Sequence, residues 1–355
     1  FKSAIQDKLT SFSGNIRVSK LSGNHSISES PIYKNMAWEK SVAQLSYIDH
    51  IQSHIQKPGI LVGKTGLAGI VIKGIGQDMP QAQIKKNLIQ GLPYLKNSQD
   101  VIISQILAKQ LKTSINQSLI LYFLSQPERP RKVNVTGIYE TGLDELDKIF
   151  ILADRDWVGK MNGWSSDSLG SYEIILKKGA DLNQSAYYLE KDLPTEWKLE
   201  TIEELYTSLF DWMNMLDRNI VIFISLLLVV ACFNLIATLW VLIMERIPMV
   251  GLLKALGSSQ KQIRTIFWWN GFFILLRGLL IGNIIAILFC YVQFTYKLIP
   301  LDPENYYMNS VPILWDTPTW LYVNVGTCLL VALTITIPTL FIKKIEPKDA
   351  INYKS

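Results

Sequence analysis

Three long apolar runs with almost no charge constrain this 355-residue chain more than any other feature. Residues 219–244 and 317–342 each form 26 consecutive uncharged positions, and residues 265–296 form 32 positions interrupted only by Arg277. A helix needs about 20 apolar residues to cross a hydrocarbon core of about 30 Å. Buried helices of soluble proteins are usually shorter and carry more polar residues. The sequence therefore predicts three membrane spans, at residues 220–243, 267–296 and 319–342.

The charges between these runs indicate how the chain crosses the membrane. Residues 245–264 carry four basic residues and one acid, residues 343–355 carry four lysines and two acids, and residues 297–318 carry one lysine and three acids. Lys and Arg accumulate in short loops on the cytoplasmic side. We therefore expect 245–264 and 343–355 to be cytoplasmic, and 1–218 and 297–318 to lie outside. Because a large outside region precedes the first run, we also expect a further span upstream of Phe1.

Cysteine and charge content narrow the class of the outside region. Cys232, Cys290 and Cys328 all lie in the apolar runs, which excludes a small domain stapled by disulfides. Residues 1–218 hold 25 basic and 24 acidic residues, so a nucleic-acid partner has no electrostatic support. The pattern of this region is mixed α and β. The expected strands are 14–21, 69–75, 118–124, 131–140 and 171–179, and the expected helices are 101–111 and 201–218.

The segment 201–218 is amphipathic and leads directly into the first apolar run. Leu205, Leu209, Trp212 and Leu216 recur at helical spacing. Such a helix suits the outer membrane–water boundary, although a core helix of the outside domain fits the same periodicity.

The sequence contains no constellation typical of an enzyme active site. VGKTG at 62–66 lacks the first glycine of a phosphate-binding loop, because position 58 is Pro. His50 and His54 are four residues apart, a spacing that offers two metal ligands on a helix, but the segment also fits a strand. We expect exposed polar histidines there, and His25 is the only other one. The chain is therefore predicted to bind no metal or cofactor itself and to be no enzyme.

The stretch MERIPMVGLLKALGSSQKQIR, residues 244–264, predicts a short helix between the first two spans. Pro248 suits a first helical turn and Gly257 a helix end. Ser259 with Gln262 can form a capping box for the next helix. Such a helix either docks a partner or lies on anionic headgroups. Its apolar stripe consists of Met249, Leu252, Leu253 and Leu256.

The segment ERIPMVGLLKALGSSQKQI resembles the cytoplasmic coupling segment of the FtsX/MacB-type ABC permeases. Within that superfamily the chain is similar to the lipoprotein-releasing permeases of the LolC/LolE type. Four further segments look like theirs: FKSAIQDKLTSFSGNIRVSK, VTGIYETGLDELDKIFI, LIPLDPENYYMNSVPI and IEPKDAINY. The resemblance implies a MacB-like α/β periplasmic domain at 1–218 and an FtsX-like transmembrane domain at 219–355, with a coupling helix at 247–257.

The resemblance also implies a function. The chain would be a permease subunit in the bacterial inner membrane, paired with a second permease subunit in a homo- or heterodimer. A separate ATPase subunit would bind ATP and Mg²⁺. The complex would extract outer-membrane lipoproteins from membrane lipid and pass them to a soluble periplasmic carrier. A MacB-like efflux permease and an FtsX-like regulator of cell-wall hydrolases are the alternatives.

Three sets of residues are expected to serve that function, and one residue departs from the family. Arg277 lies where family members usually carry small or apolar residues, so we expect it to face the subunit interior or to reach towards the cytoplasmic side. The ATPase contact would use Met249, Leu252, Leu253, Lys254, Leu256 and Gly257. The lipoprotein entrance would use Met213, Leu216, Ile220 and Phe223, and the carrier contact Asn162, Gly163 and Trp164.

Overall fold

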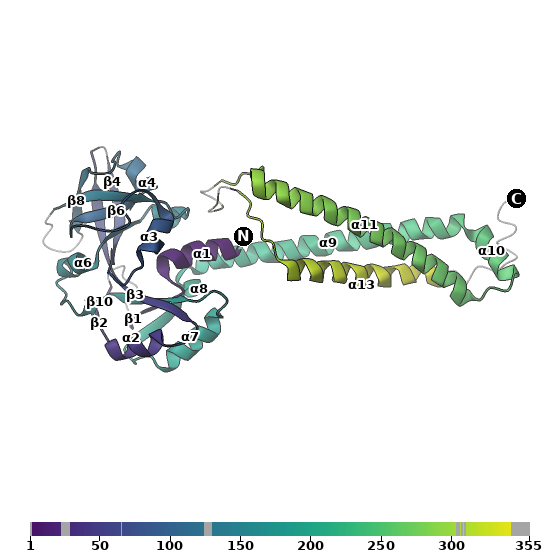
Figure 1. The fold of residues 1–355 in the computed structure, drawn as a ribbon, viewed down its shortest axis with the longest axis horizontal. Coiled ribbons are helices and arrows are strands. Elements are labelled where there is room, and N and C mark those ends of the chain that lie inside the picture. Colours follow the sequence, from purple (N-terminus) through teal and green to yellow (C-terminus); the bar gives the residue numbers. More distant parts are fainter. Residues whose placement is uncertain are drawn as a thin grey trace. The chain divides into compact units, whose positions relative to one another are not determined.

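The computed structural model describes residues 2–22, 29–64, 66–123, 130–302, 306, 308 and 310–341, and the chain divides into two compact units. The first unit consists of Phe1–Phe210 with Pro300–Ser310, and the second of Asp211–Ile299 with Val311–Ser355. The first is rich in strands and the second is helical (Figure 1). The predicted boundary at residue 218 falls inside helix α9 (Thr207–Glu245), because helix-forming residues continue on both sides of it.

The first unit is built on one ten-stranded mixed sheet in which the long strand β3 (Ile48–Val62) belongs to two substructures. One edge of β3 pairs with β4 (Leu67–Ile75). The other edge pairs first with β11 (Ser171–Leu176), through residues 48–54, and then with β7 (Ser118–Phe123), through residues 59–62. This change of partner separates the sheet into a closed barrel and an open sheet.

The barrel consists of six strands in the order β3, β4, β9 (Phe150–Asp154), β6 (Asp100–Ser104), β8 (Arg131–Tyr139) and β7, which returns to β3. Alternate side chains of these strands point into one apolar core, as the two-residue period of a strand requires. Helices α4 (Gln105–Gln110) and α6 (Arg155–Met161) contribute to the same core. Strand β5 (Leu88–Gly91) extends the sheet beyond β8.

The open sheet runs antiparallel from β12 (Trp197–Thr201) through β1 (Ile16–Lys20) and β11 to the start of β3. Helices α2 (Met36–Ala43) and α7 (Leu182–Lys191) pack on it around Trp38, whose ring lies 5.4 Å from Tyr172 and 5.2 Å from Trp197 between centroids. Several further elements are short: α3 (Gln81–Asn87), α5 (Asp144–Asp147), α8 (Ile202–Leu205), and the paired strands β2 (Ile32–Tyr33) and β10 (Ser168–Leu169).

The mixed α/β fold is confirmed, but one predicted helix is wrong in its first half. The predicted strands correspond to β1, β4, β7, β8 and β11. Residues 100–104 form β6, however, and only Gln105–Gln110 are helical. The β-branched run Val101–Ile103 pairs with β8 and β9, so long-range pairing overrides the helical spacing that continues into α4. The predicted helix 201–218 is interrupted at Tyr206, between α8 and α9.

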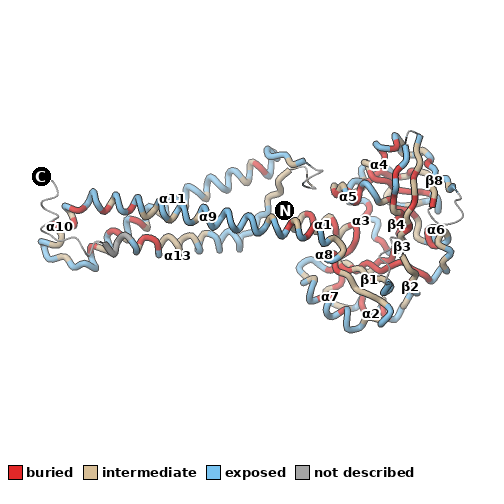
Figure 2. Tube along the Cα trace, turned by 180° about the vertical axis from the view of Figure 1, so that it is seen from behind, coloured by how far each residue is buried: buried red, intermediate tan, exposed pale blue. Residues whose placement is uncertain are grey.

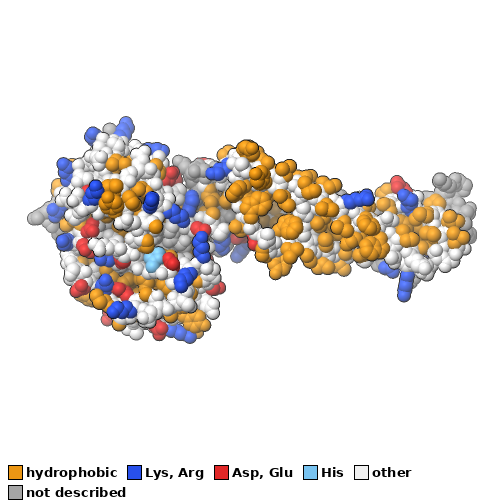
Figure 3. Space-filling model, viewed as in Figure 1, with side chains coloured by type: hydrophobic (Ala, Val, Ile, Leu, Met, Phe, Trp, Pro, Cys, Tyr) orange, Lys and Arg blue, Asp and Glu red, His pale blue; other side chains and the backbone are white. Residues whose placement is uncertain are grey.

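The described residues of the second unit form most of α9 and the whole of three further helices: α10 (Ile247–Ala255), α11 (Gln260–Tyr296) and α13 (Thr317–Phe341). Helices α9, α11 and α13 have the length and apolar composition of membrane spans, and they cover the three predicted runs. Most residues along α9 and α11 are exposed (Figure 2), and the visible surface of these helices is largely hydrophobic (Figure 3). Such a surface suits a lipid environment or a partner.

Helices α11 and α13 are joined by close packing and by amide contacts. A Cβ at Gly271 would lie 3.1 Å from Ile335 Cδ1, so glycine permits this approach. Further along, Asn283 Nδ2 donates to Asn324 Oδ1 at 2.7 Å, and Trp320 Nε1 donates to Asn283 Oδ1 at 2.8 Å. The side-chain amides of Asn283 and Asn324 therefore form a hydrogen bond with each other inside the apolar stretch.

A buried glutamine, Gln293, lies near the end of α11. Gln293 is 2% exposed, and its side chain lies between the two segments that follow and precede the connecting loop. Its Nε2 donates to Val311 O at 3.2 Å, and its Oε1 accepts from Ile299 N at 3.0 Å. Val311 N also donates to Ile299 O at 3.3 Å, so the two ends of the loop are held together.

Candidate functional site

The short helix expected between the first two spans is α10. It occupies residues 247–255, ending two residues before the predicted limit, because Leu256 is its C-cap and Gly257 adopts φ +90°. This left-handed conformation favours glycine and turns the chain out of the helix. Both contacts of the capping box between Ser259 and Gln262 are present at the start of α11. The sequence thus encodes a helix, a turn and the start of a second helix over residues 247–260.

The apolar stripe of α10 divides into an inner and an outer pair. Met249 and Leu253 are half-buried and pack against a small core where α9, α10 and α11 meet. Leu252 and Leu256, in contrast, are 59% and 75% exposed. The inner pair therefore fixes α10 to both spans, while the outer pair is available to a partner. The small core consists of Ile243, Val250, Ile263 and Phe267.

The predicted lipoprotein entrance lies on α9, but its four residues are not equally accessible. Ile220 and Phe223 are 53% and 66% exposed, and Leu216 is half-buried. Met213, at 1% exposure, is buried and offers no open surface in this structure. Helical spacing indicated one shared face but could not reveal that Met213 is covered. The accessible part of the candidate entrance is therefore the stretch from Leu216 to Phe223.

The predicted carrier contact is a compact turn after helix α6. Asn162 is the C-cap of α6, and Gly163 is exposed and adopts φ +70°. Trp164 N donates to Gly159 O at 3.0 Å, and the Trp164 side chain packs partly on the barrel core. The role of these residues stays a prediction, and the indole is used at least in part for packing.

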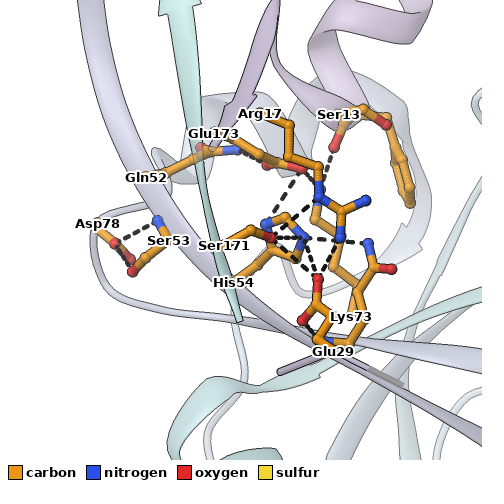
Figure 4. A network of polar contacts seen from close by, with 12 residues as sticks. Ser13, Arg17, Glu29, Gln52, Ser53, His54, Lys73, Asp78, Ser171 and Glu173 are labelled. Atoms are coloured by element: carbon orange, nitrogen blue, oxygen red, sulfur yellow. Dashed lines mark hydrogen bonds and ion pairs between the residues drawn. The ribbon is translucent and has the colours of Figure 1, made fainter. Parts of the chain in front are cut away.

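The expectation of exposed histidines is wrong for His54. Both histidines lie on β3, but the His54 side chain is 1% exposed, at the point where β3 changes partner from β11 to β7. His54 Nε2 lies 3.0 Å from Ser171 Oγ and 3.6 Å from Glu29 Oε1 (Figure 4). His25 lies outside the described residues. Within the ranges that the structure describes, no group of three or more His, Cys, Asp or Glu is placed to hold a metal ion.

His54 belongs to a buried network of charged and polar side chains (Figure 4), most of which come from β1, β3, β4 and β11. Lys73 Nζ from β4 donates to Glu173 Oε1 on β11 at 2.6 Å, and both side chains are 2% exposed. Glu173 Oε2 accepts from Gln52 Nε2 at 2.7 Å. Arg17 from β1 pairs with Glu29, whose Oε2 accepts from a backbone N–H of β3 at 2.6 Å. Each buried charge thus has an opposite charge or hydrogen-bond donor nearby.

Burial dominates the proton affinities in this network. It lowers the pKa of Lys73, an effect that the neighbouring Glu173 opposes, and it raises the pKa of Glu29, which Arg17 opposes. Burial lowers the pKa of His54 well below its usual range, and the positive charges of Lys73 and Arg17 add to this. The imidazole is therefore neutral at neutral pH and serves as a hydrogen-bonding group.

The network also anchors helix α1 (Lys2–Ser13) to the sheet. Lys73 Nζ donates to Phe12 O and lies 4.8 Å from the centre of the Phe12 ring. Next to it, Ser13 Oγ lies 2.8 Å from Tyr206 OH, at the break between α8 and α9. The end of α1 and the beginning of α9 are therefore tied to one place in the first unit.

Arg277 is exposed on α11. No ion pair joins it to another residue in the described part of the chain. Among the described residues its side chain therefore does not make the expected interior contact, and its reach towards the cytoplasmic side stays a prediction.

Comparison with known proteins finds one family match, which falls within the helical part of the chain. The family profile described as FtsX-like permease C-terminal matches residues 221–347. The lipoprotein-releasing system transmembrane protein LolC of Xylella fastidiosa is 20% identical over 275 residues, which cover 72% of this chain and 65% of that protein. LolC of Buchnera aphidicola is 24% identical over 329 residues, covering 87% and 78%. LolE of Haemophilus influenzae is 24% identical over 270 residues, covering 70% and 62%.

Two solved structures are similar to part of the chain. The periplasmic region of MacB from Actinobacillus actinomycetemcomitans has 14% identity and a TM-score of 0.39, covering 58% of this chain and 97% of that one. The extracellular domain of the ABC-type transporter YknZ from Gram-positive bacteria has 13% identity and a TM-score of 0.36, covering 53% and 100%.

Proposed function

We propose that this chain, an FtsX-like permease of the ABC-transporter class, extracts lipoproteins from the bacterial inner membrane and passes them to a periplasmic carrier. The observation that carries the proposal is helix α10, which is fixed to two spans on one face and presents Leu252 and Leu256 on the other. The names of the LolC and LolE relatives supply the substrate class.

The proposed reaction needs an energy source outside this chain. Each CH₂ of an acyl chain that leaves the membrane costs about 0.8 kcal/mol, so extracting several chains requires repeated input of energy. In VGKTG the residue at the position of the first motif glycine is Pro58, which argues against a phosphate-binding loop here. ATP and Mg²⁺ therefore bind to a separate ATPase subunit, and a second permease subunit completes the complex.

Coupling to the ATPase rests on the two faces of α10. Leu252 and Leu256 dock on the ATPase, and movement of α10 passes to the spans because Met249 and Leu253 are packed between α9 and α11. Lys254 and Gly257 border the same contact. In this arrangement α10 lies on the cytoplasmic side and the α/β unit in the periplasm, as the distribution of basic residues indicates.

The lipoprotein enters between Leu216 and Phe223 on α9, where the apolar run begins. Ile220 and Phe223 present apolar side chains that suit acyl chains, whereas Met213 contributes only if it becomes uncovered. The carrier contact at Asn162, Gly163 and Trp164 completes the proposal.

The coupling step is tested by charge substitutions on the outer face of α10. Leu252→Asp and Leu256→Asp are each expected to reduce the ATPase recovered with the purified permease, because an aspartate would be buried in an apolar contact. The matched control is Ser258→Asp, which adds the same charge just beyond the helix. Normal recovery of ATPase and normal lipoprotein release in both leucine variants would refute the docking surface.

The substrate class is tested by a photo-crosslinking amino acid at residues 216, 220 and 223 in cells that express a tagged outer-membrane lipoprotein. Crosslinks are expected only when the lipoprotein is acylated. Position 240, which is exposed on the same helix five turns further along, is the matched control. No crosslinks at the three positions, with normal expression and assembly, would favour efflux or control of cell-wall hydrolases instead.

A further inference from the structure

A pocket of about 280 Å³ lies between the beginning of α11 and the last turns of α13. Neither the ATPase contact nor the lipoprotein entrance uses it. Its position within the first turns of α11 places it beside the boundary between the basic segment 245–264 and the apolar run. The lining residues are Lys261, Arg264, Thr265 and Trp268 of α11 and Thr336 of α13.

One side of the pocket is cationic, because Lys261 and Arg264 line it. Arg264 Nε is buried and has no hydrogen-bond partner, and neither Arg264 nor Lys261 forms an ion pair with any residue that the structure describes. Thr265 is satisfied, since its hydroxyl donates to Lys261 O at 2.8 Å. A guanidinium forms its strongest hydrogen bonds with carboxylate or phosphate oxygens, often two at once. The pocket therefore presents two positive charges, and the buried Nε of Arg264 has no acceptor among the described residues.

An aromatic wall continues from the basic pair towards the apolar part of α11. Trp268 stacks on Phe272, with ring centroids 5.3 Å apart and planes at 8°. Trp269 and Phe273 stand beside them and are 49% and 54% exposed. Trp residues are typical of the membrane–water interface, where one end of the ring meets headgroups and the other meets acyl chains. The surface thus changes from cationic to apolar within two helical turns.

We propose that this pocket binds the phosphate headgroup of an anionic phospholipid, whose acyl chains lie along Trp269 and Phe273. Basic pockets between membrane helices on the cytoplasmic side are suited to such headgroups. Inorganic phosphate carries the same charge but makes no use of the aromatic wall. An acidic side chain of a protein partner also matches the charge but has no apolar tail to cover the wall.

The test is lipid competition on the full chain. The chain is purified in detergent with equal amounts of phosphatidylglycerol and phosphatidylcholine, and native mass spectrometry counts each retained lipid. Arg264→Gln is expected to lower phosphatidylglycerol retention roughly fivefold, the effect of losing one basic residue at an anionic headgroup, with phosphatidylcholine unchanged. Arg264→Lys keeps the charge and should restore part of the retention. Lys261→Gln, at an exposed side chain, repeats the test with little risk to folding.

The matched control is Arg246→Gln, which removes an exposed positive charge from the same segment outside the pocket. Retention that falls equally in this control would show general attraction and overturn the site. Displacement of phosphatidylglycerol by millimolar inorganic phosphate would identify a free-phosphate site instead. An Arg264→Gln chain that keeps its lipid but loses its ATPase would identify a protein contact. Unchanged retention in both pocket variants would also overturn the proposal.

Discussion

The two units of the chain treat their charged residues in opposite ways. In the α/β unit, Lys73 and Glu173 are 2% exposed and are held inside the protein by each other and by their neighbours. In the helical unit, the buried polar side chains among the described residues are uncharged, namely Gln293 and Thr334. Its described charges lie near the helix ends, with Arg277 as the exception. The first unit pairs its buried charges within the protein, whereas the second exposes an apolar surface that suits lipid or partner proteins.

This difference indicates which interactions stabilise each unit. A buried ion pair depends on its partner being present, because the cost of removing a charge from water is repaid only by that partner. Exposed apolar helices depend instead on the surrounding solvent being lipid. Changes to charged residues should therefore act strongly in the first unit, while changes to polar contacts should act weakly in the second.

The largest loss of stability is expected for Lys73→Met. The substitution leaves Glu173 buried without its ammonium partner and should lower the free energy of unfolding of the α/β unit by about 3–5 kcal/mol. The measurement is thermal or denaturant unfolding of the full chain in detergent, followed by tryptophan fluorescence. The double variant Lys73→Met with Glu173→Gln should recover most of the loss, since no unpaired charge remains.

Lys198→Met provides the matched control for that experiment. Lys198 pairs with Glu200 at 2.9 Å, but both side chains are about one third exposed, so the loss should stay below about 1 kcal/mol. Equal losses in the buried and exposed variants would show that the network is hydrated and would remove the contrast between the units.

The second effect concerns pH and Asp147 in the α/β unit. Burial raises the pKa of Asp147 from 3.8 to about 6, although Thr141 and Gly142 donate hydrogen bonds that oppose the shift. The folded state therefore keeps a proton that the unfolded state loses between pH 4 and 6. Raising the pH through this window should cost about 3 kcal/mol of stability from this group. Asp147→Asn should abolish that part of the pH dependence, measured as the difference in unfolding free energy between pH 4 and pH 7.

The interpretation of Asp147 fails if its asparagine variant retains the parental slope between pH 4 and 6.

The smallest effect is expected inside the membrane. Asn283→Leu removes the contacts with Asn324 and Trp320, and a double-mutant cycle with Asn324→Leu should give a coupling energy of about 0.6–1 kcal/mol. The value is small because the freed amide finds other partners in the same helices. Unfolding of the two single variants and the double variant in detergent supplies the cycle. Strict additivity would mean that the amides do not stabilise the helix pair.

Much of the helical unit could be predicted from local sequence. The apolar runs mark the spans because charge is excluded from the hydrocarbon core, and the capping box at Ser259 marks the start of α11 through contacts three residues apart. The helices nevertheless extend beyond the runs, with α9 starting at Thr207, because helix propensity does not end where apolarity ends.

Less of the α/β unit could be predicted from local sequence. Lys73 and Glu173 are 100 residues apart, and strand pairing alone brings them together, so each resembles a surface charge in the sequence. The sequence did not predict strand β6, because its apolar run continues directly into the short helix α4. For the candidate site, periodicity found the stripe on α10, but the division between its inner and outer pairs depends on the packing of α9 and α11.

The hydrogen bonds of Gln293 near the end of α11 bear on how the chain inserts into the membrane. Gln293 holds Ile299 and Val311, the residues on either side of the connecting loop, so α11 and α13 form a hairpin whose ends are already hydrogen-bonded. Backbone groups that enter a bilayer without partners oppose insertion. If these hydrogen bonds form before insertion, α11 and α13 can enter the membrane together as one hairpin, and α13 would not have to partition alone.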